Sequence, residues 1–178
     1  MNRILQILLF VLVGVSSCSI VVPEKYNDTF GVYKENKVVS EQLNAMTLDE
    51  KIGQVFMVPV YSNRSDFHKK EILSLIEKHH IGGVIFMKGH PYAQYKWTKA
   101  FNKKSKTPLF VAMDAEWGMS MRLDSIIKYP KQMTMGAIDN NKLIKKFASN
   151  AGKQMQLMGV NVSFGPVVDI NSNPANPV

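Results

Sequence analysis

Two acidic residues stand where an apolar segment ends, in the stretch VAMDAEWGMSMRL at residues 111–123. Asp114 and Glu116 are two positions apart, and in an extended backbone their side chains would share one face, about 7 Å apart. Two carboxylates at such a separation suit glycoside hydrolysis, where the distance between them decides between retention and inversion. Trp117, followed by a glycine, adds an aromatic platform for a sugar ring. The open alternative is structural: Asp114 caps a turn, and Glu116 pairs with Arg122 to brace the loop.

The segments around these residues alternate between short apolar runs and amphipathic helical patterns. Apolar runs predict strands, and the spacing of apolar side chains predicts helices. Thr47 and Glu50 form a capping box that starts one more short helix. Strand–helix alternation implies parallel pairing through right-handed crossovers, and continuous apolar runs indicate strands buried on both faces. The chain is therefore an α/β protein, with strands expected at 55–60, 84–87, 109–113 and 160–164 and helices at 71–80, 92–102 and 142–158.

Four strand–helix units are compatible with an open doubly wound sheet or with part of a (β/α)8 barrel. No strand is followed by G-x-G-x-x-G or G-x-x-x-x-G-K-[ST], either of which would favour the open sheet. Polar residues follow the predicted strands instead, at 61–64, 88–90, 114–116 and 169–171. A barrel gathers strand ends at one mouth, where such enzymes work. We therefore expect a partial (β/α)8 TIM-type barrel, roughly its first half, with Lys88 and His90 as further residues at the mouth.

The charge pattern gives no indication of a nucleic-acid partner. The formal net charge is +8 and the pI is about 9.5, but the lysines are spread along the chain without interleaved aromatic residues. His79 and His80 are adjacent on a predicted helix, so their side chains point in different directions. A cation near the helix carboxyl end explains them more simply than a metal site does. We expect no metal and no cofactor.

The first residues predict export. A positive start and an apolar run too short to span a bilayer are typical of a signal peptide over residues 1–18. The tetrad Val-Ser-Ser-Cys ends at Cys18, the only cysteine, and resembles the bacterial lipobox, whose cysteine carries a lipid. Ordinary cleavage near small residues is the alternative. The sequence thus predicts a lipid-anchored protein of the cell envelope, facing the periplasm or the outside, with a tether at 19–39 before the domain at 40–178.

Five blocks of the sequence resemble glycoside hydrolase family 3 in order and approximate spacing. They are MTLDEKIGQVFMV, IGGVIFMKG, VAMDAEWGMSMRL, YPKQMTMGAI and GVNVSFGPVVDINSNPANPV. The resemblance is to the amino-terminal (β/α)8 domain of that family and covers about residues 40–178. The D-x-E-x-G form is more similar to the β-N-acetylhexosaminidase branch than to the β-glucosidase branch.

The resemblance implies a role for each matched residue. Asp114 would bind hydroxyls of the sugar before the scissile bond, Arg122 would contact the sugar or hold Asp114, and Glu116 would support them. Asp169 would line or brace the mouth. The implied enzyme removes terminal β-linked sugars, N-acetylglucosamine foremost, by a retaining mechanism. Its general acid and nucleophile are not matched before Val178, so we expect an amino-terminal fragment, inactive alone. The alternatives are a β-glucosidase of the same family or a non-catalytic carbohydrate-binding barrel.

Overall fold

The computed structural model describes residues 36–167, 172, 173 and 175. The chain divides into two compact units, Met1–Ala45 and Met46–Val178, and each is described by itself. In the first unit the described part is essentially helix α3 (Lys37–Ala45), which begins inside the segment predicted to be a tether. The side-chain oxygen of Asn36 accepts the first free N–H groups of α3, which explains why the helix starts there.

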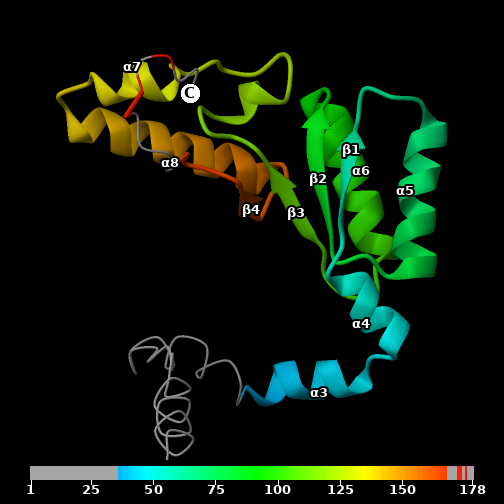
Figure 1. Ribbon diagram of the computed structural model, residues 1–178. Helices are drawn as coiled ribbons and strands as arrows, with labels where there is room; N and C mark the ends of the chain where they lie inside the picture. Colours follow the sequence, from blue (N-terminus) through cyan, green and yellow to red (C-terminus); the bar gives the residue numbers. More distant parts are fainter. Residues whose placement is uncertain (1–35, 168–171, 174, 176–178) are drawn as a thin grey trace, which may run out of the picture. The chain divides into compact units, whose positions relative to one another are not determined.

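The second unit alternates helices and strands as the sequence predicts (Figure 1). The four strands form a parallel sheet in the order β1-β2-β3-β4, so each new strand joins the same edge. This is the first half of a (β/α)8 barrel, as predicted. Its elements are α4 (Leu48–Gln54), β1 (Met57–Tyr61), α5 (Asp66–His79), β2 (Gly83–Lys88), α6 (Pro91–Lys104), β3 (Phe110–Met113), η1 (Met119–Met121), α7 (Gln132–Gly136), α8 (Asn141–Leu157) and β4 (Val162–Ser163).

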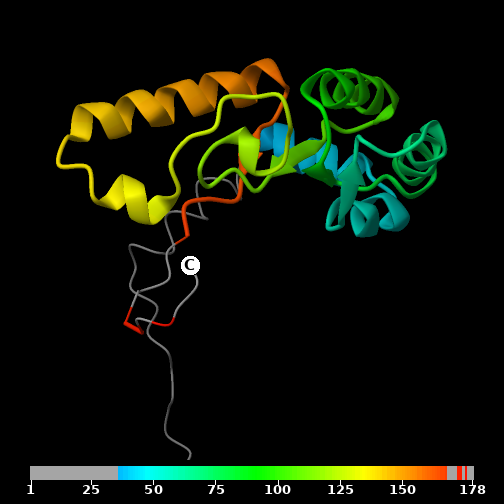
Figure 2. The same cartoon turned by 90° about the horizontal axis from the view of Figure 1, so that it is seen from above.

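The helices α5 and α6 lie side by side against one face of the sheet, and the core is between them and the strands (Figure 1). Strand register aligns Val58, Val84 and Val111 on this face, where the last two are fully buried. The opposite face is less covered, because Phe110 is 60% exposed. The prediction that the strands are buried on both faces is therefore wrong for the described residues. Seen from above, α8 and α7 extend away from α5 and α6 (Figure 2).

Several element boundaries differ from those predicted. Strand β1 begins at Met57, because the N–H of Val55 still donates to Ile52 at the end of α4, 3.3 Å away. Helix α5 begins at Asp66, well before the predicted residue 71. Strand β4 is only two residues long, at 162–163, against a predicted five-residue run.

Asn161 compensates for the shortness of β4. Its side-chain oxygen accepts the Val111 N–H at 2.8 Å, and its side-chain nitrogen donates to the Leu109 carbonyl at 3.0 Å. Its own backbone N–H donates to the Val111 carbonyl. One asparagine thus occupies ladder positions that a longer strand would fill, and buried backbone groups at the start of β3 stay paired.

The amino end of the sheet is closed by α4. Thr47 and Glu50 form the predicted capping box, with both reciprocal hydrogen bonds present. The Lys106 ammonium lies 2.5 Å from Glu50, and its hydrogen bond, followed by that of the Thr47 N–H, lowers the pKa of Glu50 to about 2. Gly82, directly before β2, lies against α4 so closely that a Cβ on it would be 2.0 Å from the Gln54 carbonyl oxygen.

Candidate functional site

The loops that follow β1, β2 and β3 are tied together by backbone hydrogen bonds. The Ser62 N–H donates to the Lys88 carbonyl at 2.9 Å, which joins the first two strand ends. The Gly89 N–H donates to the Arg122 carbonyl at 3.2 Å, and the Asp124 N–H donates back to Gly89 at 3.0 Å. The segment that contains Arg122 is therefore fastened to the end of β2, although it follows β3 in the chain.

Gly89 makes this fastening sterically feasible. A Cβ at this position would lie 1.8 Å from the Ser62 hydroxyl oxygen, which is itself buried. The polar residues at 88–90 predict a place for this loop at the mouth, but the role of its glycine was not predicted. A Gly between two polar residues directly after a strand is the signal that could have found it.

Asp114 and Arg122 form an ion pair at the carboxyl end of β3. The Arg122 guanidinium donates through Nη2 to the Asp114 carboxylate, and both side chains are about three-quarters buried, with 24% and 25% exposed. The Arg122 Nε is buried and has no protein partner among the described residues. The pair uses one of the five guanidinium N–H groups, and a quarter of each side chain stays exposed, so further N–H groups and the remaining lone pairs of Asp114 are left for a ligand.

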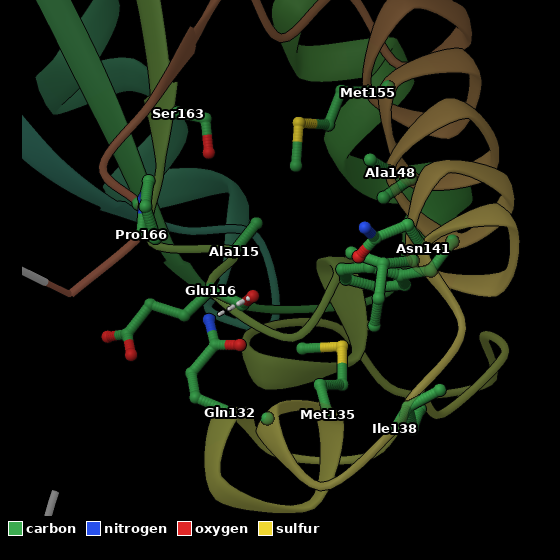
Figure 3. A pocket seen from close by; sticks show the side chains of 16 residues that line it. Ala115, Glu116, Gln132, Met135, Ile138, Asn141, Ala148, Met155, Ser163 and Pro166 are labelled. Atoms are coloured by element: carbon green, nitrogen blue, oxygen red, sulfur yellow. Dashed lines mark hydrogen bonds between the residues drawn. The ribbon is translucent and has the colours of Figure 1, made fainter.

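The structural alternative drawn from the sequence is wrong in its pairing. Arg122 contacts Asp114 and not Glu116, and β3 ends at Met113, so the extended geometry assumed for the two acids does not apply. The Glu116 carbonyl accepts a 2.6 Å hydrogen bond from the Gln132 side chain, while the Glu116 carboxylate points away from the cavity beside it (Figure 3). Glu116 therefore anchors this loop to α7 through its backbone.

Trp117 is partly exposed, and the Lys131 ammonium lies 5.6 Å from the centre of its ring. The next residue, Gly118, has φ +88°, and a Cβ on it would lie 2.8 Å from the Tyr129 ring. Tyr129 in turn packs edge-on against Phe147 of α8, with ring centres 4.8 Å apart. The backbone next to Trp117 therefore packs against Tyr129, which in turn contacts α8.

A cleft of about 690 Å³ lies between this loop and the helices α7 and α8 (Figure 3). The β3 loop contributes Ala115 and Glu116, and the segment after β4 contributes Gly165 and Pro166. The helices contribute mostly apolar side chains, with Met135 and Met155 pointing into the space (Figure 3). The cleft is therefore a mostly apolar space next to the loop that carries Asp114 and Arg122.

Other predicted residues fall elsewhere. His90 caps α6 by accepting the Tyr92 N–H, and Lys88 is the exposed last residue of β2. Asp169 and Cys18 lie outside the described residues. Among residues 36–167, 172, 173 and 175, no group of three or more metal-ligating side chains comes together. Within the same part of the chain, no helix has the length and hydropathy needed to cross a membrane.

Comparison with known proteins places this geometry in a family. Residues 47–178 match the Glycosyl hydrolase family 3 N terminal domain. The chain is 33% identical over 121 residues to a β-hexosaminidase A of Pseudoalteromonas piscicida, covering 61% of this chain and 20% of that protein. It is 25% identical over 140 residues to a β-N-acetylglucosaminidase/β-glucosidase of Cellulomonas fimi, covering 79% and 24%.

A solved structure has a similar fold. It is a β-glucoside phosphorylase bound to 2FGlc, with a TM-score of 0.71 and 23% identity, and the match covers 79% of this chain and 25% of that chain. The present chain thus spans about a fifth to a quarter of the length of these proteins. The match over residues 47–178 shows that the chain belongs to glycosyl hydrolase family 3, with sequence similarity to a member named β-hexosaminidase.

Proposed function

We propose that this chain is the sugar-binding, amino-terminal part of an exported glycoside hydrolase that removes terminal β-linked N-acetylglucosamine. The observation that carries the proposal is the Asp114–Arg122 ion pair at the carboxyl end of β3, where barrel enzymes hold their substrates. Two relatives support N-acetylglucosamine as the sugar: the Pseudoalteromonas protein is named a β-hexosaminidase, and the Cellulomonas protein is named a β-N-acetylglucosaminidase/β-glucosidase.

The ion pair suits the recognition of two neighbouring hydroxyl groups. A carboxylate accepts hydrogen bonds from both hydroxyls, and a guanidinium that donates to the same carboxylate holds it in one orientation. The Arg122 side chain is 25% exposed, so guanidinium N–H groups that do not bind Asp114 can donate to a sugar oxygen. In this proposal Glu116 supports the loop through its backbone and Asp169 lines the mouth. Trp117 offers its indole face to the apolar side of the ring.

Cleavage follows the retaining course that the family resemblance implies. An aspartate outside the matched blocks attacks the anomeric carbon while a general acid protonates the leaving oxygen. Water then attacks the glycosyl-enzyme, and the sugar leaves with its original β configuration. In this mechanism the described residues hold the non-reducing sugar while groups elsewhere in the whole protein perform the bond chemistry.

The second candidate is a β-glucosidase with the same site. The Cellulomonas relative is named for both activities, which makes the preference for the 2-acetamido group the point to test. The third candidate is a non-catalytic barrel that binds carbohydrate. Such a protein would bind the sugar through the Asp114–Arg122 pair but would not hydrolyse it.

The test measures kcat/KM of the whole protein on aryl β-N-acetylglucosaminide and aryl β-glucoside. We expect the first to be the better substrate, and the first product formed to be the β anomer by NMR. Better turnover of the glucoside would support the second candidate. Binding of N-acetylglucosamine without turnover of either substrate would support the third, and the α anomer would contradict retention.

A further inference from the structure

A histidine of α5 holds the end of β1. The Nε2 atom of His68 lies 3.2 Å from the backbone N–H of Tyr61, the last residue of the strand, and accepts its hydrogen bond. The pairing of β1 with β2 shifts register between Val60 and Tyr61, so this amide stands at an irregular point of the ladder. A side chain from the following helix thus supplies the acceptor for the strand end.

The surroundings of His68 fix its ring. The side chain is 12% exposed and lies between the rings of Tyr61 and Trp97, with centres 6.0 and 6.1 Å away. Because Nε2 accepts a hydrogen bond, the neutral ring carries its proton on Nδ1, which is 3.5 Å from the Glu71 carboxylate. Glu71 comes from the same helix. The loop after β1 adds one more charge, the Arg64 guanidinium, 4.1 Å from the centre of the Tyr61 ring.

The strand end held by His68 leads to the candidate sugar site. The residue after Tyr61 is Ser62, whose N–H donates to the Lys88 carbonyl. The residue after Lys88 is Gly89, which exchanges backbone hydrogen bonds with the Arg122 segment. The contacts therefore run from α5 through the ends of β1 and β2 to the arginine that pairs with Asp114.

We propose that His68 is a positioning residue for sugar binding, which acts through the ends of β1 and β2 on the Asp114–Arg122 pair. This proposal rests on the proposed function, because its expected effect is on the affinity for the sugar substrate. A histidine that only filled the core would be replaceable by any side chain of similar size that preserved stability. A positioning histidine requires an acceptor at the place of Nε2.

Two amide variants separate these roles. The Gln oxygen in His68→Gln reaches about as far as Nε2, whereas the Asn oxygen in His68→Asn reaches only about as far as Nδ1. His79→Gln, at the exposed end of the same helix, is the matched control. We expect His68→Asn to raise KM of the whole protein for the aryl glycoside roughly tenfold with kcat within about twofold. His68→Gln and His79→Gln should stay within about twofold of the parent in both.

Hydrogen exchange of the 178-residue chain tests the contact without any turnover. The Tyr61 amide should exchange roughly tenfold faster in His68→Asn than in His68→Gln, and the Gly89 and Asp124 amides should follow it. Equal exchange in the two variants would overturn the proposal, as would equal KM. If exchange differs between the two variants but the whole protein hydrolyses neither glycoside, the role of His68 in positioning the strand ends is supported. Only the proposed function is then contradicted.

Discussion

Arg122 donates to the carboxylate of Asp114 while its own carbonyl accepts the N–H of Gly89. One residue therefore connects the end of β3 with the end of β2. The Arg122 side chain orients the Asp114 carboxylate, and the Arg122 backbone holds the loop after β3 at the end of β2. Substitutions at this pair should affect sugar binding more than folding, because both side chains are still a quarter exposed.

Asp114→Asn should lower kcat/KM of the whole protein on the aryl β-N-acetylglucosaminide by roughly 10²- to 10³-fold. Asn keeps the volume but loses the charge, and charge-assisted hydrogen bonds are worth about 1.5–3 kcal/mol each, at about 1.4 kcal/mol per decade of rate. Steady-state kinetics measure the loss, and circular dichroism checks the fold. Glu116→Gln is the control and should cost less. A loss within threefold for Asp114→Asn would make the motif a structural turn.

Arg122→Lys should lower kcat/KM about tenfold or more, although it preserves the charge. A lysine ammonium lacks the planar guanidinium, which can donate to Asp114 and to a ligand at the same time. Lys128→Ala, an exposed cation in the same loop, should leave kcat/KM unchanged. Wild-type kinetics in Arg122→Lys would show that only the charge of this residue matters.

Glu50→Gln should destabilise the chain at neutral pH and lose this effect in acid. Gln at this position preserves the capping box, so the substitution removes the charge facing Lys106. Because the pKa of Glu50 is lowered from 4.5 to about 2, its contribution is complete above pH 4.5 and disappears as the pH falls towards 2.

Urea midpoints at pH 7, 4 and 2.5 measure this difference between Glu50→Gln and the parent. The difference should be largest at pH 7 and smallest at pH 2.5. Asp49→Asn, an exposed acid of the same helix turn, should show little difference at any pH. A pH-independent effect of Glu50→Gln would point to packing rather than charge.

Gly82→Ala should destabilise the chain by about 3 kcal/mol, because its Cβ would lie 2.0 Å from a backbone carbonyl that cannot rotate away. Gly152→Ala is the matched substitution within α8, where a Cβ meets nothing within 4 Å. It should stabilise the helix by up to about 1 kcal/mol. Thermal unfolding of both variants checks the opposite signs, and a neutral Gly82→Ala would contradict the close contact between this turn and α4.

Labelled fatty acid should enter the expressed wild type and not Cys18→Ser. The reason is the lipobox-like tetrad that ends at the only cysteine of the chain. Detergent partitioning gives a second measurement, since the lipidated protein should enter the detergent phase. Equal labelling of both forms would leave ordinary secretion as the route of export.

Much of the fold could be predicted from the sequence because its signals are local. The Thr47–Glu50 box uses four consecutive residues, and α8 ends at Leu157, one residue from the predicted end at 158, with Gly159 at φ +74° just beyond it. Apolar runs located all four strands, and their alternation with helices predicted the parallel sheet. The start of α5 was missed, because the only apolar residue at 66–70, Phe67, is exposed and does not continue the apolar spacing of the helix.

The partners of the site residues required the tertiary structure. The sequence offered Arg122 two acids, both within eight positions, and propensity does not distinguish between them. The choice of Asp114 follows from the end of β3 at Met113 and from the anchoring of the next loop to Gly89 and Gln132. Likewise, the contact of His68 with the Tyr61 amide arises because α5 packs back against its own strand.

The sequence by itself determined which residues could bind a sugar and which elements carry them, since composition, caps and periodicity act within a few residues of one another. Only the tertiary structure decided which of those side chains meet. That choice depends on strand ends and loop anchors contributed by segments far apart in the chain, and the free energy of each contact depends on its surroundings in the folded protein.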